Sequence, residues 1–211
     1  MTLDGAPGTP IASRFRGYLP VVVDVETAGF DAERHALLEV AIVTLAVGTD
    51  GRWGCEQTHH AHVEPFPGAE LDADALKFNR IDPYHPFRFA LSEREALEQL
   101  FRPVRRAVRA GGCTRAVLVG HNPSFDLGFV NAAARRSGVK RNPFHPFTTF
   151  DTATLGGLAF GQTVLARVVQ AAGLAWDERE AHSAIYDAER TAELFCAVVN
   201  LWDERAGPGM P

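Results

Sequence analysis

Two carboxylates stand at the end of the most apolar stretch of the chain. Residues 18–24 read YLPVVVD, and Asp24 is followed two positions later by Glu26. Because residues i and i+2 of a strand point to the same face, both carboxylates are expected to converge there. Two like charges at the edge of an apolar sheet repel each other, and a divalent cation such as Mg²⁺ or Mn²⁺ would neutralise them. The alternative is a pair of solvated acids at a strand end.

Two further stretches place acids at the start of a helix. GHNPSFD at 120–126 puts Asp126 in a first helical turn, where the helix dipole favours an anion. HSAIYD at 182–187 puts His182 in the preceding loop if Ser183 caps the helix, and the histidine could then fold over Asp187. A histidine with a pKa of about 6.5 can take a proton from water at neutral pH. Taken singly, each stretch is also compatible with an ordinary helix-start acid or a surface histidine.

Five strands and five helices are predicted to position these residues. We expect strands at 18–24, 37–47, 59–63, 116–119 and 149–151, and helices at 71–79, 92–110, 124–137, 163–172 and 184–203. Ser92 and Glu95 form a capping box, and Pro103 is expected to kink or split the helix that follows. Three strands early in the chain, followed by alternating helices and strands, predict an α/β fold. Its five-stranded mixed sheet would have three antiparallel strands plus two further strands and would be flanked by helices.

The length of 211 residues suits a single domain, which we expect over 14–205 between a flexible N-terminus at 1–13 and a flexible C-terminus at 206–211. No apolar stretch has the length of a signal peptide core or a membrane span. The three cysteines, Cys55, Cys113 and Cys196, are widely scattered, which favours buried thiols in a reducing cytoplasm over disulfides or a zinc site.

In chain order, Asp24, Glu26, Asp126 and Asp187, with His182 five residues before the last, resemble the DEDDh-type 3′–5′ exonucleases. Each motif alone is weakly specific, whereas the ordered set is strongly specific. Two metal ions in such a site can activate a water molecule and stabilise the leaving 3′-oxygen of a phosphodiester.

Longer stretches, which together cover about residues 14–202, resemble the ribonuclease T family within this group. They read RFRGYLPVVVDVETAGF, HVEPF, FNRIDP, GHNPSFD, KRNPFHPF, TFDT and AHSAIYDAERTAELF. The resemblance implies a ribonuclease H-like fold and a homodimeric exoribonuclease that trims 3′ ends of tRNA and other stable RNAs next to duplex and also digests single-stranded DNA. It further implies that the four carboxylates hold two Mg²⁺ ions and that His182 is the general base.

The same resemblance implies that four phenylalanines stack the terminal bases of the substrate. They match Phe30, Phe78, Phe125 and Phe147. Asp74 stands where the family has a glutamate that helps to make 3′ cytosine a poor substrate, so we expect this discrimination to be relaxed or repositioned. Because the chain has 14 phenylalanines, the alternative is that these side chains fill the core.

Charge is segregated along the chain, although the net charge is only -5. Residues 102–150 carry nine basic side chains and one acid, a local charge of +8 against -13 for the remainder. The family resemblance implies a substrate-binding patch remote from the protomer's own metals, which would hold the duplex stem for the partner's active site in the dimer. Its residues match Arg14, Arg16, Arg109, Arg115 and Lys140. The alternative is an ordinary solvated helix face.

The same five catalytic residue types also occur in DNA proofreading exonucleases and oligoribonucleases, which differ from the leading hypothesis in substrate. A non-catalytic nucleic-acid-binding protein on the same fold is the alternative of a different class. Intact residues at all five positions argue against it.

Overall fold

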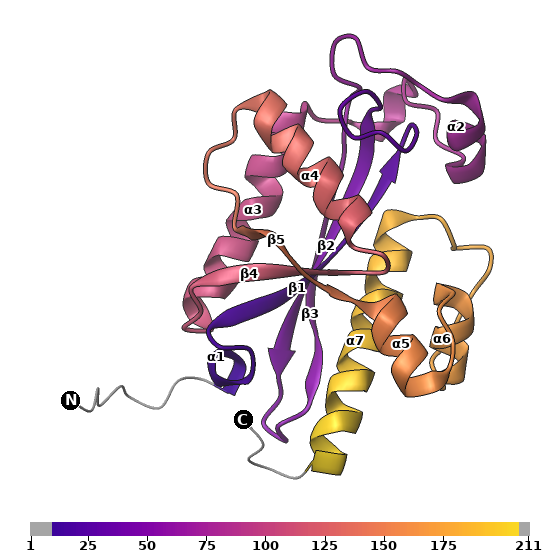
Figure 1. Cartoon of the computed structure of the whole chain (residues 1–211). Coiled ribbons are helices and arrows are strands. Elements are labelled where there is room, and N and C mark those ends of the chain that lie inside the picture. The colour runs from indigo at the N-terminus through magenta and orange to yellow at the C-terminus, as the bar shows by residue number, and fades with distance from the viewer. Residues whose placement is uncertain (1–9, 207–211) are drawn as a thin grey trace.

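The computed structural model describes residues 10–206, which form one mixed sheet with helices on both faces (Figure 1). The strand order is β3-β2-β1-β4-β5. The strands are β1 (Tyr18–Thr27), β2 (Leu37–Val47), β3 (Trp53–His62), β4 (Arg115–Gly120) and β5 (Phe144–Asp151). β1, β2 and β3 pair antiparallel, whereas β4 and β5 are added parallel to β1. The expected α/β fold with three antiparallel strands and two further strands is therefore confirmed.

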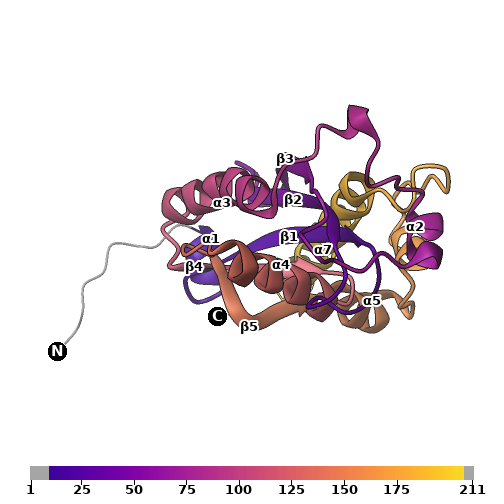
Figure 2. The same cartoon turned by 90° about the horizontal axis from the view of Figure 1, so that it is seen from above.

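Seven α-helices and one 3-10 helix lie within the described range. They are α1 (Pro10–Arg14), α2 (Ala73–Asn79), the 3-10 helix η1 (Pro86–Arg88), α3 (Glu93–Ala110), α4 (Ser124–Ser137), α5 (Thr152–Phe160), α6 (Leu165–Ala171) and α7 (Ala184–Ala206). α3 and α4 cover one face of the sheet, and α7 with α5 and α6 covers the other (Figure 1). Seen from above, α2 and α3 lie at opposite sides of the molecule (Figure 2).

The apolar run in β1 follows from its place in the middle of the sheet. Val21 and Val23 pack with the α3 and α4 side chains, while Val22 packs with Phe195 of α7 on the opposite face. A strand buried on both faces needs apolar residues at consecutive positions, so the run shows no alternation. β1 continues past Asp24 to Thr27, which keeps Glu26 within regular strand geometry.

Several expected boundaries shift in the structure. β3 begins at Trp53 rather than His59, because its backbone pairs with β2 although half of the side chains of this edge strand are exposed. β5 begins at Phe144, ahead of the expected 149. α5 is not among the expected helices, since its sequence TATLGGLAF holds two glycines, which disfavour a helix. The side chain of Asp151 caps its N-terminus. A Cβ at Gly156 would meet Val168 at 2.4 Å, so the glycine allows α5 to pack closely against α6.

Pro103 does not split α3, which runs without a break through 18 residues. Leu100 and Val104 on either side of the proline are fully buried in the core, and this packing holds the helix together. The capping box of Ser92 and Glu95 is present as expected. Gly138 ends α4 in the left-handed conformation, with φ 69°.

The two chain ends expected to be flexible lie largely outside the described residues. α1 nevertheless begins at Pro10, and Ile11 packs against the core. None of the helices in the range 10–206 combines the length and the apolar character needed to cross a bilayer. The expectation of buried cysteines is correct for Cys196 and wrong for Cys55, which is exposed because it lies on the edge strand β3; all three are free.

Candidate metal and nucleic-acid site

Three carboxylates meet at the C-terminal end of β1. Asp24, Glu26 and Asp187 each offer an oxygen atom that lies within 4.8 Å of the others. The first two alternate with Val25 along the strand and so share a face. Asp187 comes from the first turn of α7, where its backbone N–H donates to the Ser183 carbonyl over 2.9 Å. Residues more than 160 positions apart are thus joined by the packing of α7 on the sheet.

Asp126 lies beside this group, buried in the first turn of α4 with 4% of its surface exposed. The backbone N–H of Val25 donates to Asp126 Oδ1 over 3.1 Å, which ties the start of α4 to the strand that carries the other two acids. The approach depends on Gly120, because a Cβ at that position would stand 3.2 Å from Asp126 Oδ2 and 3.1 Å from the Pro123 side chain. The structure therefore brings all four predicted carboxylates to one end of the sheet.

The four carboxyl groups share raised pKa values. Burial raises the pKa of Glu26 to about 8, with further contributions from Asp187, Glu39 and Asp126. Burial also raises the pKa of Asp126 to about 7, although the backbone N–H groups that donate to this carboxylate lower its pKa. The pKa of Asp24 is raised well above its ordinary value by burial and then by its acidic neighbours, and burial raises that of Asp187. Negative charge in this group needs a compensating cation.

Glu39 belongs to the same electrostatic environment and was missed by the sequence interpretation. It is the cross-strand partner of Glu26 on β2, and His62 Nδ1 stands 3.0 Å from its Oε1. A single acid in the otherwise apolar stretch LLEVAIV was the available signal. Its position becomes informative only once the register of β2 against β1 is known.

The donor set fits a divalent cation. Asp187 Oδ1 is buried, and no residue between 10 and 206 donates a hydrogen bond to it. An unpaired buried carboxylate oxygen beside two further carboxylates is costly without a ligand. Hard oxygen donors of this kind suit Mg²⁺ or Mn²⁺.

His182 stands at the entrance to the carboxylate group. Its backbone has φ 68°, and its N–H donates to Asp187 Oδ2 over 3.2 Å, so the residue does fold back over the first turn of α7. The imidazole is exposed and lies against the ring of Phe78, with 4.3 Å between ring centroids. Phe78 is itself positioned by the next residue, Asn79, whose Nδ2 donates to the Thr27 carbonyl over 3.0 Å.

Three of the four predicted stacking residues do not fill the core. Phe30, Phe78 and Phe147 are 88%, 63% and 79% exposed. Phe125, which precedes Asp126, is partly buried and pairs with Phe30 at 6.3 Å between centroids. The exposed rings of Phe30, which contacts the residue before Asp126, and of Phe78, which contacts His182, offer flat apolar surfaces for bases.

Phe147 and Asp74, both predicted to bind substrate, lie on different elements. Phe147 lies on β5, two residues before Thr149, which is level with Leu118 of β4 and Val21 of β1, so it is several residues short of the level of Asp24. Its ring pairs with His145 at 4.6 Å between ring centroids. Asp74 is exposed in the first turn of α2, one turn before Phe78 and on the same helix face.

The predicted basic residues lie at the end of the sheet opposite to the carboxylates. Arg16 precedes β1 and Arg115 begins β4, and the two strands pair from Tyr18 and Arg115 onward. Arg109 ends α3 and Lys140 follows α4. These four side chains are exposed. The placement leaves them far from the protomer's own carboxylate group.

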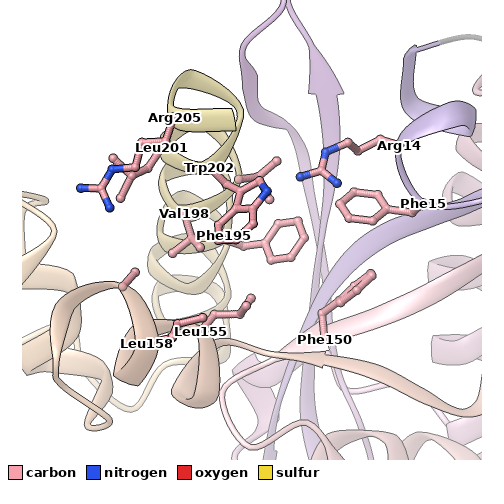
Figure 3. A pocket seen from close by; sticks show the side chains of 12 residues that line it. Arg14, Phe15, Phe150, Leu155, Leu158, Phe195, Val198, Leu201, Trp202 and Arg205 are labelled. Carbon is pink, nitrogen blue, oxygen red and sulfur yellow. The ribbon is translucent and has the colours of Figure 1, made fainter. Parts of the chain in front are cut away.

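Arg14 differs from the other members of this set. It forms an ion pair with Asp203 at 3.0 Å and lies over the ring of Phe15. Figure 3 shows Arg14 and Phe15 at the wall of a cavity between α7, α5, β5 and the end of α1. The cavity has a volume of about 570 Å³ and is lined mostly by apolar side chains such as Leu155 and Trp202. Arg14 is therefore partly engaged in holding α1 against α7.

Comparison with known proteins agrees with this geometry. The model of the family described as Exonuclease matches residues 21–195. Crystallised E. coli Exonuclease I in complex with a dT13 oligonucleotide is similar, with a TM-score of 0.64 and 14% identity over 90% of this chain; the match spans only 42% of that longer chain. The nuclease domain of 3′hExo, a DEDDh family member bound to rAMP, is similar with a TM-score of 0.62 and 17% identity, over 86% of this chain and 91% of that one.

A third structure, of a 3′-exonuclease that recognises the 3′ end of a histone mRNA stem-loop, has a TM-score of 0.62 and 18% identity. The alignment covers 87% of this chain and 63% of that one. At these identities the likeness is one of fold.

Proposed function

Because the chain belongs to the exonuclease family, we propose that it is a DEDDh-type 3′–5′ exoribonuclease of the ribonuclease T kind. It would trim single-stranded 3′ ends of tRNA and other stable RNAs in the cytoplasm, and it would also act on single-stranded DNA. The observation that carries the proposal is the meeting of Asp24, Glu26 and Asp187 within 4.8 Å, with Asp126 buried beside them.

The four carboxylates would hold two Mg²⁺ ions, or Mn²⁺ in their place. Bound there, the ions would supply positive charge for the attacking and leaving oxygens of the phosphodiester. The protein's own contribution is to pre-position the acids from three elements, β1, α4 and α7. Their raised pKa values in the metal-free protein support this role. The ionised form of each buried carboxyl group is unfavourable unless a nearby cation compensates its charge.

His182 would take the proton of the attacking water. Its imidazole is exposed at the edge of the carboxylate group, while its backbone N–H is bound to Asp187, so the ring can move without loss of the backbone anchor. Contact with Phe78 restricts where the ring can lie. General base catalysis of this kind contributes about 10²–10⁴-fold to a rate.

The terminal nucleotides would stack on the phenylalanines. Phe30 pairs with Phe125, the residue before Asp126, and Phe78 lies beside His182. Each such stack is worth about 1–3 kcal/mol and tolerates every base. Asp74 would face the terminal base from the same side of α2 as Phe78, and its short side chain would alter the discrimination against 3′ cytosine.

We further propose that the enzyme acts as a homodimer. The exposed basic residues Arg16, Arg109, Arg115 and Lys140 lie too far from the protomer's own acids to bind phosphates next to the cleaved bond. In a dimer they would bind the duplex stem of the RNA whose 3′ end enters the partner's site. The structures of similar fold include one with a DNA oligonucleotide and one that recognises an RNA stem-loop, which supports action on both nucleic acids.

Digestion of an RNA duplex with a 3′ overhang tests the function. We expect one nucleotide at a time to be removed in the presence of Mg²⁺, with slowing as the duplex is approached, and no digestion in EDTA. Rapid removal of mismatched DNA ends, or of two-to-five-nucleotide RNA alone, would instead identify the proofreading or oligoribonuclease alternative.

A further inference from the structure

Two cysteines from distant parts of the chain lie in contact where β3 packs against α7. Cys55 lies on the same face of β3 as Trp53, which packs with Cys196 in the core between the sheet and α7, so the two cysteine side chains lie next to each other. Hydrogen bonds between β3 and α7 lie on both sides of this pair along the two elements. The Trp53 N–H donates to Asn200 Oδ1 over 2.8 Å on one side, and Thr58 Oγ1 donates to Glu189 over 2.8 Å on the other. The strand and the helix are therefore fixed against each other over the segment that contains both thiols.

The two thiols differ in their environments. Cys55 is exposed on the edge strand, whereas Cys196 is 4% exposed within the core between the sheet and α7. The neighbouring Cys196 thiol lowers the pKa of Cys55, although burial, Glu193 and Glu189 act in the opposite direction, whereas Cys55 and burial together raise the pKa of Cys196. An accessible thiol that more readily forms a thiolate thus stands next to a shielded thiol that keeps its proton.

We propose that Cys55 and Cys196 form a two-cysteine oxidation site that reacts with small hydroperoxides and closes to a disulfide between β3 and α7. The Cys55 thiolate attacks one peroxide oxygen and displaces the alkoxide, or hydroxide from hydrogen peroxide, which leaves a sulfenic acid on Cys55. The Cys196 sulfur then attacks the Cys55 sulfur, gives up its proton, and releases water. In total, two thiols lose two electrons and two protons, and one peroxide is reduced to an alcohol and water.

Contact between the thiols makes closure a local event. A disulfide needs sulfur atoms about 2.05 Å apart, which side-chain rotation can provide when the residues already touch across a packed strand and helix. Asp187 lies on the same helix as Cys196 but more than two turns away, and neither cysteine contacts the carboxylates. The disulfide would stabilise the attachment of α7 to the sheet edge and leave the metal ligands in place.

Cys113 provides a matched control within the chain. It is partly buried, its Sγ donates to the Gly111 carbonyl, and burial raises its pKa. It has the chemistry of a thiol without the partner that the proposal requires.

Thiol counting on the full-length protein tests the proposal. The reduced protein is treated with hydrogen peroxide in the absence of reductant, denatured, and titrated with a thiol reagent. We expect the count to fall from three to one, a non-reducing peptide map to link positions 55 and 196, and the melting temperature to rise until reductant is added. In Cys113→Ser the count should fall from two to none, and in Cys55→Ser both remaining thiols should persist.

Two results would overturn the proposal. One is conversion of Cys55 to sulfinic acid while Cys196 stays a thiol, and the other is a disulfide between two molecules in place of the internal link. Because Cys55 is exposed, Cys55→Ser should fold normally, so the test does not depend on a substitution in the core.

Discussion

The imidazole of His182 lies against the phenyl ring of Phe78, with 4.3 Å between the ring centroids and an angle of 50° between the rings. The histidine comes from the loop before α7 and the phenylalanine from α2, more than 100 residues earlier. In the proposed function, Phe78 would therefore have two roles: it would offer a surface to a base, and it would limit the positions of the imidazole that takes the proton from water.

Replacement of Phe78 by alanine should reduce kcat/KM for single-stranded RNA by roughly tenfold to a hundredfold, since it removes one stacking surface and the contact of His182. Phe87→Ala is the matched control, because Phe87 is 77% exposed on η1 and has no contact with His182. Steady-state kinetics on a short overhang measure both variants. Equal losses in the two would show that the Phe78–His182 contact has no part in the reaction.

Gly120→Ala should weaken metal binding without unfolding the protein. The new Cβ would stand 3.2 Å from Asp126 Oδ2, so the carboxylate has to move away from its bond with Val25. We expect the Mg²⁺ concentration for half-maximal activity to rise at least several-fold. Gly128→Ala is the control, because its Cβ meets nothing within 4 Å in the middle of α4, and it should raise stability by about 0.5–1 kcal/mol. Unchanged Mg²⁺ dependence in Gly120→Ala would contradict this explanation.

The stability of the metal-free protein should fall as the pH rises from about 5.5 to 8.5. The pKa of Glu26 is about 8 and that of Asp126 about 7 in the folded state, whereas both lie near 4 in an unfolded chain. Across this range the folded state therefore binds more protons than the unfolded state, and each extra bound proton lowers the free energy of unfolding by about 1.4 kcal/mol per pH unit.

Urea unfolding in EDTA at a series of pH values measures this dependence. Glu26→Gln removes one titrating carboxyl and should flatten the slope, and saturating Mg²⁺ should reduce it in the unmodified protein because the cation favours the anionic carboxylates. An identical slope for Glu26→Gln and the unmodified protein in EDTA would show that Glu26 does not titrate in this window.

Arg16→Ala should weaken binding of an RNA hairpin with a 3′ overhang and lower the slope of log K against log salt by about 1. Arg16 is exposed before β1, at the end of the sheet where the other basic residues lie. Arg94→Ala is the control, since Arg94 pairs with Glu98 on the exposed face of α3. Arg14→Ala is less informative, because it also releases Asp203. If the salt dependence of Arg16→Ala equals that of Arg94→Ala, Arg16 makes no phosphate contact.

The parts of the fold that could be predicted are those where local sequence and buried surface agree. β2 and α4 have the expected bounds, because an apolar strand and a helix closed by Gly138 are specified by their own residues. The convergence of Asp24 and Glu26 follows from strand geometry alone. The meeting of these two with Asp126 and Asp187 required the resemblance to a family, since no local rule joins four distant segments.

The features that could not be predicted depend on tertiary contacts. β3 is an edge strand whose apolar and polar residues do not alternate, so only its pairing with β2 defines it as a strand. The contribution of Glu39 required the register of β2 against β1, and the contact of Cys55 with Cys196 required the packing of α7 on β3. In each case the sequence lacks the periodicity that would reveal the neighbour.

In the proposed function, the carboxylates at the end of β1 carry out metal-dependent removal of 3′ nucleotides. Asp24→Asn keeps the shape of the side chain and removes the charge, and Asp50→Asn in the exposed turn between β2 and β3 is its control. The direct measurement is release of nucleoside 5′-monophosphates from RNA with a single-stranded 3′ end in Mg²⁺. We expect the rate of release to fall at least a thousandfold in Asp24→Asn, the equivalent of about 4 kcal/mol, and to be unchanged in Asp50→Asn. Release by Asp24→Asn at the normal rate would contradict the proposed function.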